Sequence, residues 1–203
     1  MIVVSSLALK GMLDKSRAQL EREFGALELH FDATQAILKN LASVRADLLV
    51  LTAEAMDDLK KTGLVTETRA LGSSGVGVAV RAGAPKPDIG TVEAFKASLE
   101  RAQSVAHSKA GASGIYFSAL IDQLQLKLKK RVIVEKGPVG LAVARGEAEI
   151  GVQQLCELEP VPGIDIVGPL PAALQKVTYF SAGIPANAAD PRGAAALMRR
   201  LAL

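Results

Sequence analysis

The sequence predicts an α/β protein made of two lobes that are joined by two extended crossings. Short apolar runs alternate with stretches of helical periodicity, and this alternation occurs in two blocks separated by extended chain rich in glycine and proline. Such alternation is typical of parallel sheets covered by helices. The 203 residues, of which 49% are hydrophobic and 22% charged, suffice for two small lobes that share their chain crossings.

The first block contains three strand–helix units. Each begins with an apolar or β-branched run and continues with apolar residues at helical spacing. In each unit, small polar residues, which favour helix starts, separate the strand from the helix. The units span residues 2–24, 27–41 and 47–63. The continuous apolar run at 47–51 is typical of a strand that is buried on both faces of a parallel sheet.

The second block repeats this pattern after a glycine-rich extended run at 75–80. Its strands are expected at residues 104–107, 132–134, 149–152 and 164–167, and its helices at 91–101, 115–124 and 138–146. A second extended segment at 176–182 is the return crossing, and a helix at 191–203 packs back on the first lobe. We therefore expect lobe 1 at residues 1–74, completed by 183–203, and lobe 2 at 75–182 with both crossings.

Small and neutral polar residues follow the predicted strands, where ligands of open parallel sheets bind. Several of them directly precede helices, so that free backbone N–H groups and the positive end of the helix dipole favour an anion. The alternative is that each Ser, Thr or Asp only caps its helix. The predicted ligand-binding residues are Ser5, Ser6, Thr34, Ser113, Gly114, Gln153 and Gln154.

Residues for catalysis are scarce in the sequence, and we expect no catalytic residue, no metal and no cofactor. There is no His or Cys spacing for a metal, and Gly75-x-Gly77 lacks the third glycine of a dinucleotide site. Ser113 lacks the spacing of a nucleophile elbow. Cys156 has apolar neighbours that are typical of a core thiol. His107 at a strand end is the residue that an enzyme on this scaffold would use as a base.

Composition limits the partners. The net charge is +3 and aromatic residues make up 3% of the chain, so nucleic-acid binding is not expected. No run of about 20 apolar residues spans a membrane. The start of the chain has no signal-peptide pattern, so we expect a periplasmic protein if a signal peptide was removed and a cytoplasmic one otherwise. We expect a monomer.

Several stretches together resemble the type II periplasmic binding proteins, in particular the molybdate-binding-like substrate-binding proteins of ABC transporters. The stretches that carry the resemblance are 5–10, 74–83, 111–116, 144–154, 167–171 and 180–183. In this resemblance Ala8 and Thr34 stand where molybdate binders carry serines, and Gln154 stands where they carry a tyrosine. It implies that hydroxyls and backbone N–H groups hold an oxyanion.

The resemblance implies a solute-binding protein that closes its lobes on a small anion, either a molybdate-like oxyanion or a small carboxylate, and catalyses nothing. An ABC permease is the implied partner. Two alternatives stay open: a small-molecule sensor domain, and a cytoplasmic isomerase-like or lyase-like enzyme that acts on small organic acids on the same scaffold.

Overall fold

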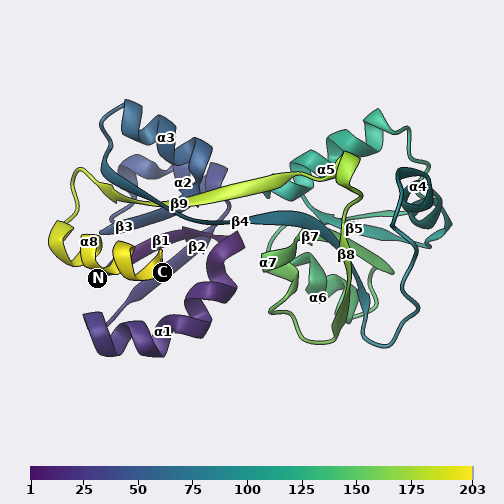
Figure 1. Ribbon diagram of the computed structural model, residues 1–203, viewed down its shortest axis with the longest axis horizontal. Helices are drawn as coiled ribbons and strands as arrows, with labels where there is room; N and C mark the ends of the chain where they lie inside the picture. Colours follow the sequence, from purple (N-terminus) through teal and green to yellow (C-terminus); the bar gives the residue numbers. More distant parts are fainter. Residues whose placement is uncertain (203) are drawn as a thin grey trace. The chain divides into compact units, whose positions relative to one another are not determined.

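The computed structural model describes residues 1–202, which fold into two compact units (Figure 1). Unit 1 consists of Met1–Ser73 together with the chain from Thr178 onward, and unit 2 is Ser74–Val177. Two long strands, β4 (Val65–Arg81) and β9 (Val177–Pro185), pass from one unit to the other. The predicted α/β fold class is confirmed, while the lobe boundaries drawn from the sequence stay predictions.

Unit 1 is built on a sheet with the strand order β2-β1-β3-β9, followed by β4. The strands β2, β1 and β3 are parallel, and β9 runs antiparallel to β3. The strands of its parallel part are β1 (Ile2–Ser6), β2 (Glu28–Asp32) and β3 (Leu48–Thr52). Its helices are η1 (Leu7–Leu9), α1 (Lys10–Phe24), α2 (Thr34–Lys39), η2 (Leu41–Ser43), α3 (Ala53–Lys61) and α8 (Pro191–Leu201).

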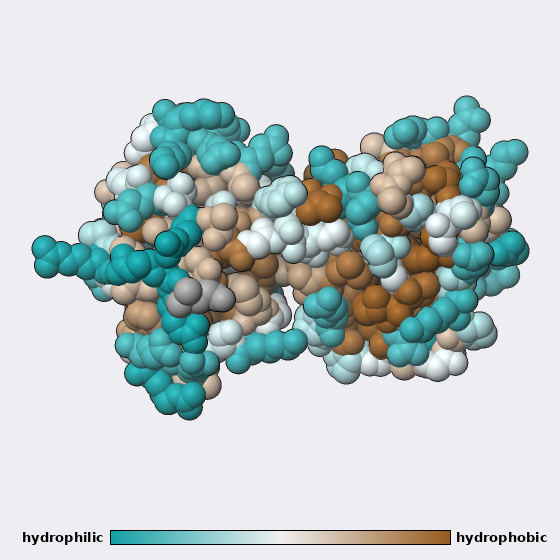
Figure 2. All heavy atoms as spheres, viewed as in Figure 1, coloured by the Kyte–Doolittle hydropathy of each residue, from teal (hydrophilic) through white to brown (hydrophobic). Residues whose placement is uncertain are grey.

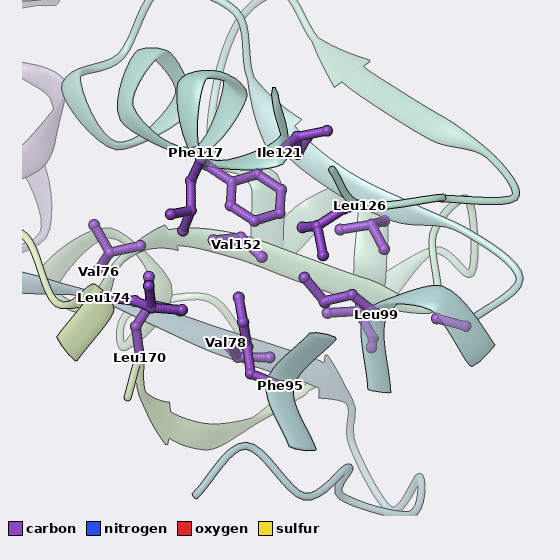
Figure 3. Packing of buried hydrophobic residues seen from close by; sticks show 14 of the residues in the cluster. Val76, Val78, Phe95, Leu99, Phe117, Ile121, Leu126, Val152, Leu170 and Leu174 are labelled. Atoms are coloured by element: carbon purple, nitrogen blue, oxygen red, sulfur yellow. The ribbon is translucent and has the colours of Figure 1, made fainter. Parts of the chain in front are cut away.

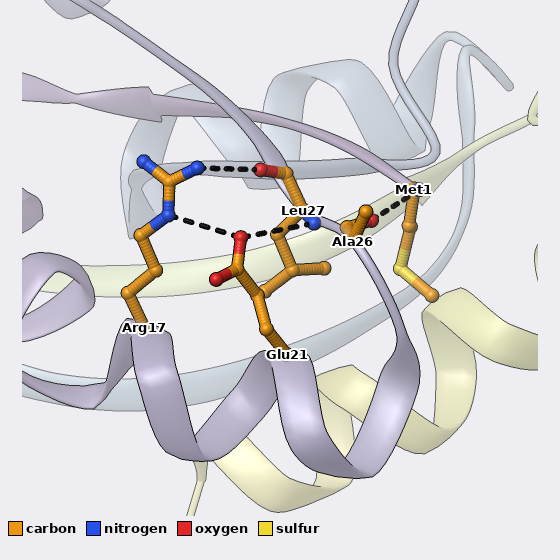
Figure 4. Close-up of polar contacts among 5 residues, drawn as sticks. All are labelled: Met1, Arg17, Glu21, Ala26 and Leu27. Atoms are coloured by element: carbon orange, nitrogen blue, oxygen red, sulfur yellow. Dashed lines mark hydrogen bonds and ion pairs between the residues drawn. The ribbon is translucent and has the colours of Figure 1, made fainter.

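The turn between α1 and β2 is closed by polar contacts (Figure 4). Arg17 Nε donates to Glu21 Oε1 at 3.0 Å, and Arg17 Nη2 donates to the carbonyl of Leu27 at 3.2 Å. Met1 N donates to the carbonyl of Ala26 at 3.0 Å. The Arg17 side chain is the main reason why the pKa of Glu21 is lowered. These bonds join the end of α1 to the starts of β1 and β2.

A buried carboxylate, Asp47, ties three parts of unit 1 together. It lies just before β3, and it accepts hydrogen bonds from the backbone N–H groups of Ile2 at 2.8 Å, Ala189 at 3.0 Å and Asp190 at 3.1 Å. Burial would raise its pKa, but these hydrogen bonds outweigh burial and lower it. The Asp47 carboxylate therefore joins β1 and the start of α8 to the start of β3.

We expect Asp47→Ala to lower the free energy of unfolding by about 2–4 kcal/mol, because three partly buried hydrogen bonds lose their charged acceptor. Urea denaturation at pH 7 measures this change. Because the folded-state pKa is depressed, the contribution of Asp47 is fully present above its ordinary pKa near 4 and is lost as the pH falls through the folded value. The exposed Asp14→Ala variant is the control, with an expected loss below about 0.5 kcal/mol.

Unit 2 is built on a sheet with the strand order β4-β7-β5-β6, and β8 pairs with the other side of β4. The strands β6, β5 and β7 are parallel, and β4 is antiparallel to β7. Its further strands are β5 (Val105–Ser108), β6 (Arg131–Val134), β7 (Ile150–Gln154) and β8 (Ile164–Pro169). Its helices are α4 (Val92–Arg101), α5 (Ala112–Gln123), α6 (Val139–Ala144), α7 (Leu155–Leu158) and η3 (Ala172–Leu174).

The main core of unit 2 lies between its sheet and the helices α4 and α5 (Figure 3). Phe95, Leu99 and Phe117 are fully buried there against Val78 and Val152 of the strands. The opposite face of the sheet packs on α6. Figure 2 shows hydrophobic surface on unit 2 in the region of α6, where Leu141 is 38% exposed.

The two units repeat one arrangement of strands. In each, the first strand of the parallel set lies in the middle, the second lies at the edge, and the third lies next to an antiparallel strand that enters from the other unit. The middle strands, β1 and β5, thus hold equivalent positions. Each ends in a buried serine, Ser6 in unit 1 and Ser108 in unit 2.

Candidate binding site at the strand ends

The carboxyl end of β5 carries two buried serines. Ser108 is the last residue of β5 and Ser113 lies in the first turn of α5, with exposed fractions of 8% and 1%. Neither Oγ atom forms a hydrogen bond within residues 1–202. A buried hydroxyl without a partner is unfavourable, and such groups in native proteins call for an explanation. Two of them at one strand end are suited to hydrogen-bond a ligand.

Gly114 determines how closely strand and helix approach. A Cβ atom at this position would lie 1.9 Å from the carbonyl oxygen of Ser108 and 2.4 Å from Ser108 Oγ. The absence of a side chain therefore lets the first turn of α5 sit directly on the end of β5. The sequence-based prediction that residues 111–114 are a loop was wrong, since α5 begins at Ala112 and includes Ser113 and Gly114.

The N-terminus of α5 has no side-chain cap. The N-cap residue is Gly111, and no side chain accepts a hydrogen bond from the first turn there. The capping alternative also fails for Ser6, which precedes η1 without a side-chain cap bond. In contrast, Thr91 accepts from Ala94 N and caps α4. The free N–H groups and the helix dipole at the start of α5 favour negative charge beside Ser113.

His107 is held from both ring nitrogens. Its Nδ1 lies 3.0 Å from the carbonyl oxygen of Ser108, and its Nε2 accepts from Arg131 Nη2 at 2.9 Å. The carbonyl requires a proton on Nδ1, so the ring is neutral with Nε2 as acceptor. Burial is the main cause of its lowered pKa, with Arg131 acting in the same direction. With no free lone pair, His107 positions Ser108 and is not available as the base that the sequence suggested.

The end of β7 carries a second polar group. Gln153 is 2% exposed, its Oε1 accepts from Val139 N at 2.7 Å, and its Nε2 donates to Glu157 Oε1 at 2.9 Å. Gln154, the last residue of β7, is equally buried and lies opposite Val76 of β4. Both glutamines were predicted as a strand-end loop, but they belong to the strand itself.

In unit 1 the predicted residues lie at the ends of β1 and β2. Ser5 is fully buried, and its Oγ donates to the carbonyl of Ser6 at 3.0 Å. Ser6 is 4% exposed, and its Oγ has no hydrogen-bond partner in the described chain. Thr34 is the first residue of α2 and is partly buried. Ser6 is thus the hydroxyl in unit 1 that corresponds to Ser108 in unit 2.

Two residues of the candidate site, Ser108 and Glu157, were missed by sequence reasoning. Ser108 was missed because the strand was ended one residue early, at His107. Glu157 lies in an otherwise apolar stretch, Leu155-Cys156-Glu157-Leu158, directly after a buried strand. A carboxylate in such a stretch is the signal that could have found it.

Cys156 is partly buried on α7, and its backbone N–H donates to Ser74 Oγ at 3.1 Å. Burial is the main cause that raises the pKa of its thiol to about 11. Because the thiolate is the reactive form, we expect iodoacetamide at pH 7.5 to modify Cys156 at least ~100-fold more slowly than free cysteine. Mass spectrometry over time measures this rate. A rate equal to that of free cysteine would contradict the buried position.

Within residues 1–202 no group of three or more His, Cys, Asp or Glu side chains is arranged to hold a metal ion. None of the helices in this part of the chain is long and apolar enough to cross a membrane. The polar chemistry at the ends of β5 and β7 therefore consists of hydroxyls, amides, backbone N–H groups and one carboxyl group.

Comparison with known proteins assigns the class. The family described as bacterial extracellular solute-binding protein matches residues 6–202. The chain therefore belongs to this family of solute-binding proteins. Among curated proteins it is 44% identical over 178 residues to an aconitate isomerase of a Pseudomonas species, a match that covers 84% of this chain and 68% of that protein.

Solved structures agree on the fold. The periplasmic molybdate-binding protein of Azotobacter vinelandii superposes with a TM-score of 0.77 at 17% identity, over 99% of this chain and 92% of that one. The regulatory domain of Synechocystis CcmR, solved with 2-PG, gives 0.69 at 12% identity, over 100% and 95%. At these identities the likeness establishes the type II periplasmic-binding fold alone.

The expectation that the protein catalyses nothing was wrong. It rested on the small, neutral residues at the strand ends and on the resemblance to molybdate binders. The relative with 44% identity is an enzyme by name, which points to enzymatic activity on this scaffold. The physical reason for the error is that hydroxyl and N–H donors that bind an anion can also stabilise negative charge in a reaction, so they do not distinguish a binding protein from an enzyme.

Proposed function

We propose that the protein is an isomerase of small unsaturated polycarboxylic acids, with aconitate as the substrate to be tested first. The observation that carries the proposal is the 44% identity to an aconitate isomerase over most of the chain. The strand ends of unit 2 support it, because Ser108 and Ser113 offer buried hydroxyl donors beside the free N–H groups of α5. Donors of this kind suit carboxylate oxygens.

The chemistry explains why hydroxyl donors are useful. Aconitate has a methylene carbon next to a carboxylate and a carbon–carbon double bond. Removing a proton from this carbon places negative charge on the neighbouring carboxylate oxygens. Preorganised donors that face these oxygens stabilise the charge as it develops. In the proposed site Ser108, Ser113 and the N–H groups of α5 have this role.

Turnover tests the proposal. Purified protein is incubated with a thousandfold excess of cis-aconitate or trans-aconitate, and the vinyl proton signals are followed by NMR. Conversion of many equivalents of one isomer into the other supports the isomerase. Absence of conversion above the rate in buffer, with folded protein, would exclude aconitate as the substrate.

Solute binding for uptake is the second candidate, which the family membership and the molybdate-binding neighbour favour. Thermal unfolding with molybdate, sulfate, citrate and both aconitates separates the ligand classes. A ligand at 100 times its dissociation constant adds about 2.7 kcal/mol. For a chain of this length this is a shift of roughly 5–10 °C. We expect this shift with the polycarboxylates; a shift with molybdate alone would favour uptake of an oxyanion.

A further inference from the structure

Glu157 differs in its surroundings from the other carboxyl groups near the strand ends. It lies on α7, the short helix that follows β7, and it is partly buried. Gln153 holds it by a 2.9 Å hydrogen bond from Nε2 to Glu157 Oε1. The orientation of the Gln153 amide is fixed, because its Oε1 accepts from the backbone N–H of Val139 at 2.7 Å. Nε2 must therefore face the carboxyl group.

The pKa of the Glu157 carboxyl group lies near neutral pH. Burial is the main cause that raises its pKa to about 7, and the hydrogen bond from Gln153 acts in the opposite direction. Its titratable neighbours along the chain are Cys156 on α7 and Glu159 at the C-cap of this helix. The pKa of Cys156 is raised to about 11, so its thiol stays neutral at this pH. A group with such a pKa both accepts and returns a proton at neutral pH.

The ladder between β5 and β7 places Gln153, which donates a hydrogen bond to Glu157, beside the end of β5 that carries Ser108. His107 of β5 pairs with Val152 of β7, so that the next residues, Ser108 and Gln153, stand at neighbouring strand ends. The Ser108 hydroxyl has no hydrogen-bond partner within residues 1–202, and Gln153 donates a hydrogen bond to Glu157. The hydroxyl donors and the carboxyl group therefore belong to the same edge of the same sheet.

We infer that Glu157 is the catalytic residue that removes and returns the proton of the substrate, and that Gln153 positions its carboxylate. This inference rests on the proposed isomerase function and deepens it. His107 is pinned through both ring nitrogens, and the buried thiol of Cys156 stays protonated. Glu157 is thus the titratable group at this sheet edge whose state suits the reaction.

The proton transfer balances without a co-reactant. The Glu157 carboxylate takes a proton from the methylene carbon, and the C–H electron pair spreads over the three-carbon allylic unit and its carboxylates. The protonated Glu157 then gives the proton to the other end of this unit, where the new methylene forms. The double bond has moved to the former methylene carbon, and rotation before the second transfer sets its geometry. No electron is gained or lost.

Glu157→Gln tests the inference, with Glu159→Gln, at the exposed C-cap of α7, as matched control. We expect kcat to fall by about 10²–10⁴-fold in Glu157→Gln, in the range for loss of a general base, with KM changed less than about threefold. Glu159→Gln should keep wild-type kcat. Circular dichroism and thermal unfolding check that both variants fold. Wild-type kcat in a folded Glu157→Gln variant would overturn the inference and leave the isomerase proposal intact.

Two further measurements do not depend on that variant. In D2O the wild-type protein should incorporate deuterium into recovered substrate. Its kcat/KM should rise with pH through about 7, because the ionised carboxylate is the base. Gln153→Met removes the donor that favours the ionised form, so this rise should move to higher pH. If kcat/KM of the Gln153→Met variant rises over the same pH range as that of the wild type, the inference is overturned. A wild-type protein without turnover or deuterium incorporation would overturn both proposals.

Discussion

Gly114→Ala is expected to abolish carboxylate binding and to destabilise unit 2 by several kcal/mol, the range for a backbone clash in a packed interior. The new Cβ atom would lie 1.9 Å from the backbone carbonyl oxygen of Ser108, which no side-chain rotation relieves. Helix α5 would have to move away from the end of β5. Ser113 and the first-turn N–H groups would move with it, away from the end of β5.

A second glycine of unit 2 provides the control for this prediction. At Gly90 an added Cβ atom would meet only the Asp88 side chain, at 3.3 Å, which can move aside. Gly90→Ala should therefore change stability by less than about 1 kcal/mol and leave binding intact. Urea denaturation and calorimetric titration with the substrate measure the two effects. Equal stability and equal binding in the two variants would mean that the close approach of Gly114 to Ser108 is needed for neither property.

Loss of both strand-end hydroxyls, in Ser108→Ala combined with Ser113→Ala, should weaken polycarboxylate binding by 100-fold or more. A hydrogen bond to a charged group contributes about 1.5–3 kcal/mol, or roughly 10- to 150-fold for each hydroxyl. Stability should stay within about 1 kcal/mol of wild type or increase, since neither Oγ has a hydrogen-bond partner within residues 1–202. The double variant should thus lose affinity for polycarboxylates without losing stability.

Ser98→Ala should show the reverse pattern. Ser98 is also buried, at 4% exposure, but its Oγ donates to the carbonyl of Asp88 at 2.7 Å. Removing it should lower stability by about 1 kcal/mol, the usual contribution of such a bond, and leave affinity unchanged. If the double variant instead lost stability and kept its affinity, Ser108 and Ser113 would be structural residues.

The order of strands and helices could be predicted from the sequence because it depends on local periodicity. The apolar run at 47–51 became β3 at Leu48–Thr52, and the tail from residue 191 became α8. The helix start at Ala112 could not be predicted, because glycines disfavour helices. Gly114 lies in the first turn because only a residue without a side chain fits so close to Ser108, a contact between helix and strand that the sequence does not display.

The candidate site was predictable only in part, for a similar reason. The serines could be placed at strand ends from their position after apolar runs, although Ser108 was assigned outside the strand it ends. Whether a serine caps a helix or keeps a free hydroxyl depends on hydrogen bonds that the sequence does not display. The pKa of Glu157 depends on burial between α7 and its neighbours, so its catalytic potential emerges only in the folded chain.

We propose that this solute-binding fold carries an isomerase, and approach to equilibrium from both sides tests this proposal most directly. Separate samples of pure cis-aconitate and pure trans-aconitate are incubated with the same catalytic amount of protein and followed by proton NMR. A catalyst brings both samples to one final ratio of isomers, at a rate proportional to protein concentration, and this is the predicted result. Two unchanged samples, in the presence of a ligand-induced thermal shift, would contradict the claim and leave a binding protein.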